Sequence, residues 1–427
     1  MNSKEQEDRV SPKRSPKPVR LLTADELLRP EEPLQERERF LPLQNLLIKG
    51  LLSFGEETRF NFGRLNILVG PNGSGKSNLI DCIRLLRYAP FNIQEAFRDS
   101  GFEDWIYRGS QSQTALVDTV AHIAGHPEGI RHQLRLGPPR RSGAPLEEVI
   151  SSAEDELSDP YFIGGHHGSA TLSVATSSKR RRERELSNKE YDPFQSILSQ
   201  IRDAAQYPEV TQLSSLYGSF RIYSEWSFGR NSNLREATPA NRSETTLSES
   251  MNDFALVLNA LEKTAAHDRI KVLLHELKET YEDYVTRVLF GRVGLQLVEA
   301  PFEEPLPAPR LSDGTLRFLA LAAILLNSEP PILICLEEPE LGMHPDMIRM
   351  VARMILDATA RAQLIVTTHS EHLLTALQDD FDALFAFDAG LTGSTVRRFS
   401  RDEYKNWCEE HSLGELWTSG ELGGNRW

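Results

Sequence analysis

The segment at residues 70–77 constrains the fold of this chain more than any other feature. It reads GPNGSGKS and satisfies the pattern G-x-x-x-x-G-K-S at every fixed position. The apolar run LNILV at residues 65–69 precedes it, and helical periodicity follows it to about Tyr88. A strand that turns through glycines into a helix lets backbone N–H groups and a helix N-terminus surround a phosphate. The segment therefore predicts a phosphate-binding loop within an α/β sheet.

The residue types in this loop predict that it binds ATP with Mg²⁺. Glycines let the backbone approach the phosphates closely. Lys76 offers a positive charge to the β- and γ-phosphate oxygens, and Ser77 offers a hydroxyl to Mg²⁺. Lys76 is therefore predicted to be catalytic as well as nucleotide-binding. The predicted nucleotide-binding residues of the loop are Asn72, Gly73, Ser74, Gly75, Lys76, Ser77 and Asn78.

Two adjacent acids follow a second apolar run. Residues 332–336 read ILICL, and Glu337 and Glu338 come directly after them. Two carboxylates at the end of a buried strand are costly unless a cation or hydrogen-bond donors face them. With this strand placed beside the phosphate-loop strand, we predict that Glu337 holds Mg²⁺. Glu338 is then the predicted general base, which deprotonates the attacking water.

Two further segments carry polar residues at the ends of predicted elements. His369 follows the predicted buried strand at residues 363–368, where it is a candidate contact for the γ-phosphate. A lone histidine is more often structural, so its position after a strand is what favours the functional interpretation. Residues 311–315 read LSDGT before a predicted helix, with Ser312 near its cap and Gly314 permitting close backbone approach. Alone, this last segment is a weak signal.

Taken in order, these four segments resemble the motifs of ABC-type ATPases: phosphate loop, signature loop, Walker B acids and switch histidine. The variant resembles the SMC, RecF and OLD branch, particularly the stand-alone predicted ATPases called AAA_21. The resemblance covers residues 43–90 and 305–427 well and the middle of the chain poorly. Other segments similar to that branch are IKG at 48–50, SFG at 53–55, EPE at 338–340, HP at 344–345, and the closing stretch at 416–424.

The resemblance implies an ATPase head with a mostly parallel sheet covered by helices, a flanking antiparallel sheet, and helical and loop insertions. It also implies an ATP-dependent homodimer or higher oligomer, in which Ser312 and Gly314 of one protomer contact ATP on the other. The metal-binding acid of the family is usually Asp, whereas this chain has Glu337. The Q-loop glutamine is not identifiable; Gln111 and Gln113 are candidates, or else belong to a surface loop.

Patterning divides the chain into five parts. Helical periodicity, broken near His267, predicts helix from residue 251 to 289, and aromatic alternation predicts a strand at 218–228. The parts are a disordered or loosely packed tail (1–41), an N-terminal ATPase lobe (42–136), a partly mobile insertion (137–250), a helical lever and strand (251–300), and a C-terminal ATPase lobe (301–427).

Composition excludes several classes of protein. The formal net charge of −14 argues against a generally nucleic-acid-binding surface, although the basic run at residues 179–184 is a candidate DNA contact or a solvated segment. The longest apolar run, residues 318–326, is too short to span a membrane, and the polar N-terminus lacks the core of a signal peptide. Three cysteines fit neither a zinc site nor a disulfide framework. A cytoplasmic protein without a membrane partner is expected.

Several functions remain open at this stage. The leading hypothesis, implied by the resemblance, is an ATPase that controls a separate effector such as a nuclease or toxin in an antiphage defence system. No Toprim nuclease is expected within the chain itself. The alternatives are a RecF-like DNA-binding repair or replication ATPase, a nucleotide-locked scaffold with little turnover, and, less favoured, a transporter subunit.

Overall fold

The computed structural model describes residues 41–98, 101–109, 114–137, 146–154, 160–165, 169–175, 181–187, 189–226, 229–241, 244–400 and 411–421. The predicted tail lies outside these ranges apart from Leu41. Gln111, Gln113, Lys179 and Cys408 also lie outside them. Within the described part of the chain, no helix is both long enough and apolar enough to cross a membrane.

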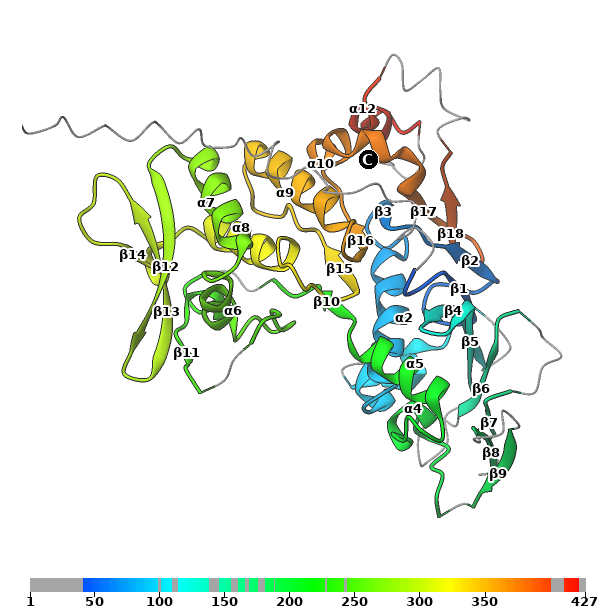
Figure 1. Ribbon diagram of the computed structural model, residues 1–427. Helices are drawn as coiled ribbons and strands as arrows, with labels where there is room; N and C mark the ends of the chain where they lie inside the picture. Colours follow the sequence, from blue (N-terminus) through cyan, green and yellow to red (C-terminus); the bar gives the residue numbers. More distant parts are fainter. Residues whose placement is uncertain are drawn as a thin grey trace, which may run out of the picture.

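A six-stranded sheet at the centre of the molecule carries the phosphate loop (Figure 1). Its order is β10-β15-β16-β3-β17-β18, and every neighbouring pair is parallel except β17 and β18. The strands are β3 (Leu65–Val69), β10 (Arg221–Tyr223), β15 (Leu333–Glu337), β16 (Gln363–Thr367), β17 (Leu384–Gly390) and β18 (Gly393–Arg398). Parallel strands end at the same edge, so the segments that follow β3, β15 and β16 meet there.

Both faces of β3, β15 and β16 are buried, which explains why these three strands are largely apolar. In β3, Ile67 and Val69 belong to one core and Leu68 to the other. The first core includes α8 (Asp313–Leu325) and α9 (Pro345–Ala358), and the second includes α2 (Lys76–Tyr88). The predicted α/β head, with helices over a mostly parallel sheet, is confirmed.

The flanking antiparallel sheet is also present, and it is larger than predicted. Its order is β2-β1-β4-β5-β6-β7-β8-β9. Its first two strands pair antiparallel, with Ile48 opposite Thr58. The strands are β1 (Asn45–Lys49), β2 (Thr58–Asn61), β4 (Ala115–Ile123), β5 (His126–Leu136), β6 (Leu146–Ser152), β7 (Phe162–Gly164), β8 (Ala170–Val174) and β9 (Arg182–Leu186).

Strands β6 to β9 come from the stretch that the sequence had indicated to be a long insertion. One cause is visible in β6, whose inward positions are Leu146, Glu148 and Ile150. The fully buried Glu148 hydrogen-bonds His132 at 2.9 Å and accepts from Ser196 Oγ at 2.6 Å. A carboxylate thus stands where an apolar residue would have revealed the alternation.

The structure corrects the prediction of helix through residue 289. Helices α6 (Phe254–Leu261) and α7 (Ala265–Leu277) are followed by a hairpin of β12 (Tyr281–Leu289) and β13 (Arg292–Glu299). Pairing with β13 overrides the local helical pattern in β12. The predicted strand at 218–228 is likewise shortened to β10, because the chain leaves the sheet at Ser224.

Short elements complete the described fold. The strands are β11 (Thr238–Pro239) and β14 (Leu306–Pro307), which both pair with β13. The helices are η2 (Ile93–Phe97), α3 (Phe102–Trp105), α4 (Ile197–Gln200), α5 (Pro208–Gly218), η3 (Asn233–Arg235), η4 (Ala308–Arg310), α10 (Glu371–Ala376), η5 (Gln378–Ala383) and α12 (Leu413–Thr418).

Candidate active site

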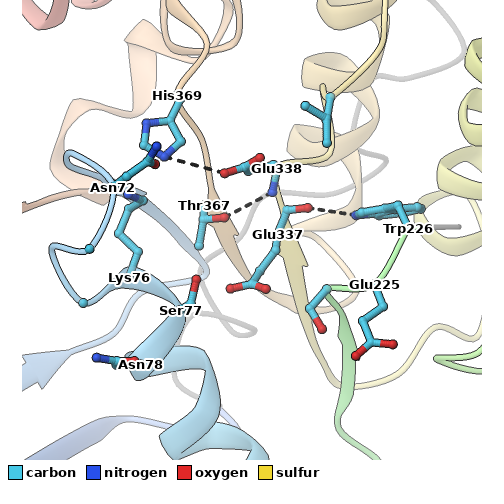
Figure 2. A pocket seen from close by; sticks show the side chains of 14 residues that line it. Asn72, Lys76, Ser77, Asn78, Glu225, Trp226, Glu337, Glu338, Thr367 and His369 are labelled. Carbon is cyan, nitrogen blue, oxygen red and sulfur yellow. Dashed lines mark hydrogen bonds and ion pairs between the residues drawn. The ribbon is translucent and has the colours of Figure 1, made fainter. Parts of the chain in front are cut away.

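A cavity of about 580 Å³ opens at the edge of the central sheet where β3, β15 and β16 end (Figure 2). Most of the residues predicted from separate sequence motifs line it together. Ser74 is fully buried behind the loop, and Ser312 and Gly314 do not line this cavity. The lining residues are Asn72, Gly73, Gly75, Lys76, Ser77, Asn78, Ser224, Glu225, Trp226, Glu337, Glu338, Leu341, Thr367 and His369.

The phosphate loop requires glycine at Gly75. This residue has φ +107°, and a Cβ there would lie 2.2 Å from Ser394 Oγ and 2.7 Å from Ser53 Oγ. Ser394 Oγ donates to Ser53 Oγ at 2.6 Å, so two distant segments pack against the loop as one unit. Ser53 belongs to the SFG segment of the sequence, which therefore supports the loop from outside the cavity.

The Lys76 ammonium lies within the loop. Its Nζ donates to the carbonyl of Gly70 at 2.7 Å and to that of Pro71 at 3.1 Å. Burial lowers the pKa of Lys76 to about 8, although nearby Glu338 and Glu337 oppose the shift. Negatively charged phosphate oxygens at this position would favour the charged form and raise the pKa again.

Glu337 and Ser77 fit the binding of a magnesium ion. The Ser77 hydroxyl hydrogen-bonds the Glu337 carboxyl, while burial raises the pKa of that carboxyl. Glu337 Oε1 is buried and has no hydrogen-bond partner. A hydroxyl and an unsatisfied carboxylate oxygen are ligands of the kind that Mg²⁺ takes, with water and substrate phosphates filling its other positions.

One spatial prediction about Glu337 is wrong. Its strand, β15, does not lie beside the phosphate-loop strand, because β16 is inserted between β15 and β3. The first turn of α2 nevertheless brings Ser77 to Glu337. The contact therefore comes from the helix that follows the loop, not from strand adjacency.

Glu338 and His369 face each other across the cavity mouth. Glu338 Oε1 lies 3.6 Å from His369 Nε2, and both side chains are partly exposed. The Glu338 backbone has φ +45°, which a residue other than glycine rarely adopts. Its N–H donates to both the carbonyl and Oγ1 of Thr367, each at 3.1 Å. Burial, followed by the charge of Lys76, lowers the pKa of His369, which favours a neutral imidazole.

Glu340 is a site residue whose role sequence reasoning missed. Its Oε1 accepts hydrogen bonds from the hydroxyl of Thr368 and the backbone N–H of His369. It thereby ties the loop after β15 to the loop after β16. The EPE segment was the only sequence signal for it, and that signal did not indicate a partner.

Ser224, Glu225 and Trp226 were also missed. They line the cavity because β10 pairs with β15 and ends at the same edge. The predicted strand at 218–228 was the available signal, but nothing in the pattern connected its end to the phosphate loop. The Q-loop candidates Gln111 and Gln113 lie outside the described residues.

The signature segment is ordered around the start of α8. Ser312 Oγ accepts from the backbone N–H of Thr315 at 3.0 Å, as expected of a helix cap. Arg235 donates to the Asp313 carboxylate at 2.6 Å and to the carbonyl of Leu311 at 2.7 Å. Ser312 is exposed, and Gly314 lies close to the carbonyl of Gly342.

Comparison with known proteins identifies the family of this chain. Residues 65–375 of the 427 match the sequence profile AAA_21, described as "AAA domain, putative AbiEii toxin, Type IV TA system". This chain belongs to the AAA_21 family. The match of this AAA_21 protein begins at the phosphate-loop strand and extends past His369, so it includes every predicted site residue.

Curated relatives of this AAA_21 protein fall into two groups. It is 36% identical over 72 residues to the chromosome partition protein Smc of Rhodopirellula baltica, which covers 17% of this chain and 6% of that protein. The Smc protein of Desulfitobacterium hafniense is similarly 41% identical over 71 residues, again 6% of its length. An ATP/GTP phosphatase of Helicobacter pylori is 18% identical over 346 residues, covering 78% of this chain and 87% of that protein.

Solved structures agree on the fold. An Smc head bound to the C-winged-helix domain of ScpA superposes with a TM-score of 0.54 at 15% identity, covering 84% of this chain and 99% of that one. The Pyrococcus yayanosii Smc head with a coiled coil and joint gives 0.50 at 12% identity, covering 86% and 99%. This AAA_21 protein thus has the SMC-like ABC ATPase head fold, and ATPases are its relatives.

Proposed function

We propose that this AAA_21 protein hydrolyses ATP to ADP and phosphate in the cavity at the edge of the central sheet. The observation that carries the proposal is the convergence of Lys76, Ser77, Glu337, Glu338 and His369 on one cavity from three strand ends. The unpartnered oxygen of Glu337 beside Ser77 adds a place for a divalent cation.

The side chains divide the chemistry among them. Mg²⁺, when bound between Ser77 and Glu337, supplies charge neutralisation for the phosphate oxygens. Lys76 neutralises charge on the β- and γ-phosphates. Glu338 accepts a proton from the water whose oxygen attacks the γ-phosphorus. The bond between that phosphorus and the β–γ bridging oxygen breaks, and the bridging oxygen leaves with ADP. Neutral His369 donates a hydrogen bond to the transferred phosphoryl group.

We further propose that two copies complete each other's sites. Ser312 and Gly314 stand at the exposed N-terminus of α8 and do not line the cavity of their own protomer. A helix N-terminus capped by a serine suits an anionic phosphate. A second copy placed head to head would bring these residues to the nucleotide, so ATP would favour the closed dimer.

Glu338→Gln is the direct test. Removing a general base lowers phosphate release by about a thousandfold, while ATP binding persists. Light scattering should then find an ATP-dependent dimer that outlasts the dimer of the unaltered protein. Glu282→Gln, an exposed position on β12, is the matched control for charge. Unchanged phosphate release in Glu338→Gln would show that Glu338 is not the general base. A protein that stays monomeric in saturating ATP would contradict the proposal that two copies complete each other's sites.

We also propose a partner, namely an effector protein such as a nuclease or toxin. The ATP state of this protein would control the effector in a cytoplasmic antiphage defence system. Two facts about relatives support it: the family description names a toxin–antitoxin system, and an Smc head has been solved with ScpA bound. Co-purification with the product of the neighbouring gene, with and without ATP, tests it. Failure of every neighbour to associate in either state would end the effector proposal.

In the described part of the predicted basic run, two arginines are paired with carboxylates. Arg181 pairs with the buried Glu209, and Arg184 pairs with Glu190 at 2.7 Å. These arginines therefore already face carboxylates. A salt-dependent DNA affinity that increases with ATP would nevertheless revive that alternative.

A further inference from the structure

A buried arginine in the signature helix contacts the loop that carries the predicted base. Arg317, on the second turn of α8, is 1% exposed. Its guanidinium donates to the carbonyl of Glu338 and, at 2.7 Å, to that of Leu341. Burying a guanidinium is costly unless its donors are satisfied. These two hydrogen bonds join α8 to the loop that carries Glu338.

Trp226 extends this contact to the predicted metal-binding residue. The Arg317 guanidinium stacks over the Trp226 ring at 4.3 Å from its centroid. The Trp226 Nε1–H donates to the carbonyl of Glu337 at 2.8 Å, as Figure 2 shows. One stacked pair therefore fixes the backbone carbonyls of both Glu337 and Glu338.

The backbone that this pair fixes is strained. Glu338 has φ +45°, and such a conformation persists only where its surroundings hold it. Strand β16 holds the N–H side of Glu338 through Thr367, and Arg317 holds the carbonyl side from α8. The direction of the Glu338 carboxylate therefore depends on where α8 lies.

We infer that Arg317 and Trp226 form a clamp that sets the position of Glu338 according to the position of the signature helix. The inference rests on the proposed function. Ser312 caps the same helix five residues before Arg317, so a nucleotide contact at the cap and the catalytic loop are joined by about one and a half helical turns. Hydrolysis is thereby coupled to engagement of the second protomer. Arg317 and Trp226 are positioning residues, because neither is assigned a contact with a reacting atom.

The clamp is tested by Arg317→Met and Trp226→Phe. A displacement of Glu338 by about 1 Å costs on the order of a hundredfold in kcat, so Arg317→Met should lose about 30- to 100-fold. Trp226→Phe retains the aromatic ring but loses the N–H, and a loss of about 3- to 10-fold is expected. KM for ATP should change less than about threefold in both, and Arg317→Lys should restore part of kcat.

The matched control is Arg361→Met. Arg361 donates to the carbonyl of Leu325 at the other end of α8, at 2.8 Å, and does not line the cavity. It should lower thermal stability as Arg317→Met does but leave kcat unchanged. Equal losses of kcat in the two variants would overturn the clamp, because general destabilisation would then explain both.

Hydrogen exchange separates failure of the clamp from failure of the proposed function. The N–H of Leu341 donates to the carbonyl of Glu338 at 3.1 Å, beside the Arg317 contact. In Arg317→Met, exchange of the amides of Glu338, Glu340 and Leu341 should accelerate about tenfold or more, with α2 unaffected. If the unaltered protein releases no phosphate but exchange still accelerates in Arg317→Met, the proposed function is overturned and the clamp is retained. Unchanged exchange at 338–341 overturns the clamp whatever the protein hydrolyses.

Discussion

The two walls of the nucleotide cavity are built in different ways. The phosphate-loop wall is one continuous segment, residues 70–78, shaped by glycines with positive φ. The carboxylate wall is assembled from three separate segments, residues 224–226, 337–341 and 367–369, which fix one another through side chains and carbonyls. The first wall is locally determined and the second depends on tertiary packing. We therefore expect substitutions in the first to alter affinity and substitutions in the second to alter turnover.

The largest expected effect on affinity follows Lys76→Ala. Removing a buried charged donor costs about 3 kcal/mol or more, which is at least a hundredfold in ATP affinity. Titration with a fluorescent ATP analogue measures it, and Lys49→Ala, an exposed residue on β1, is the control. Normal affinity with lost turnover would contradict the division between the walls, because Lys76 would then act only in hydrolysis.

Two glycines of the first wall should differ in their tolerance of alanine. Gly75→Ala meets Ser394 and Ser53 within 2.7 Å, whereas a Cβ at Gly73 meets nothing within 4 Å. Alanine at position 73 would therefore cost only the strain of a φ of +76°, about 1 kcal/mol. Gly75→Ala should therefore reduce ATP affinity about tenfold more than Gly73→Ala does. Ser394→Ala should recover part of the loss, and equal losses without recovery would show that packing beneath the loop is unimportant.

The lowered pKa of Lys76 predicts a pH dependence of the first wall alone. The charged form binds phosphate, and the free protein has a pKa of about 8. Above that pH the lysine must take up a proton on binding, so ATP affinity should fall by up to about tenfold per pH unit. Below pH 8 the lysine is already protonated, so its titration should not change ATP affinity. Calorimetry in buffers of different ionisation enthalpy would detect the proton uptake, and Lys76→Arg should abolish the slope.

The smallest effect is expected at Ser312, which caps α8. Ser312→Ala should lower the free energy of unfolding by about 1 kcal/mol, measured with urea. Ser412→Ala removes the cap of α12, where Ser412 and Glu415 form a capping box, and should cost a similar amount. Only Ser312→Ala should also weaken the ATP-dependent dimer. If the two variants dimerise equally, Ser312 does not contribute to the nucleotide site of the second protomer.

The contrast between the walls also explains what could be predicted from the sequence. The phosphate loop, its strand and α2 are local, so pattern and spacing predicted them. Residues 332–336 and 363–368 could be predicted as strands because both faces of the sheet are buried there, which makes residues 332–336 and 364–366 uninterrupted apolar runs. The roles of Glu337 and Glu338, which follow residues 332–336, were inferred from the cost of leaving carboxylates there unpaired.

The remaining features depend on contacts between distant segments. Arg317 reads as one charge in an apolar helix, and its partners Glu338 and Trp226 lie in other segments. The buried Glu148 interrupts the apolar alternation of β6, and pairing with β13 makes residues 281–289 a strand and not a helix. In each case a long-range partner, which local periodicity does not reveal, determined the structure.

The place of β3 in the sheet has a consequence for the nascent chain. The motif at residues 70–77 leaves the ribosome before either neighbour of its strand, β16 or β17, has been translated. Ser394, which packs under Gly75, comes later still. An incomplete polypeptide ending before residue 363 would thus contain the whole phosphate motif and still lack the strands that flank it. Bound ATP can therefore stabilise the flanked phosphate loop only after β16 and β17 have been made.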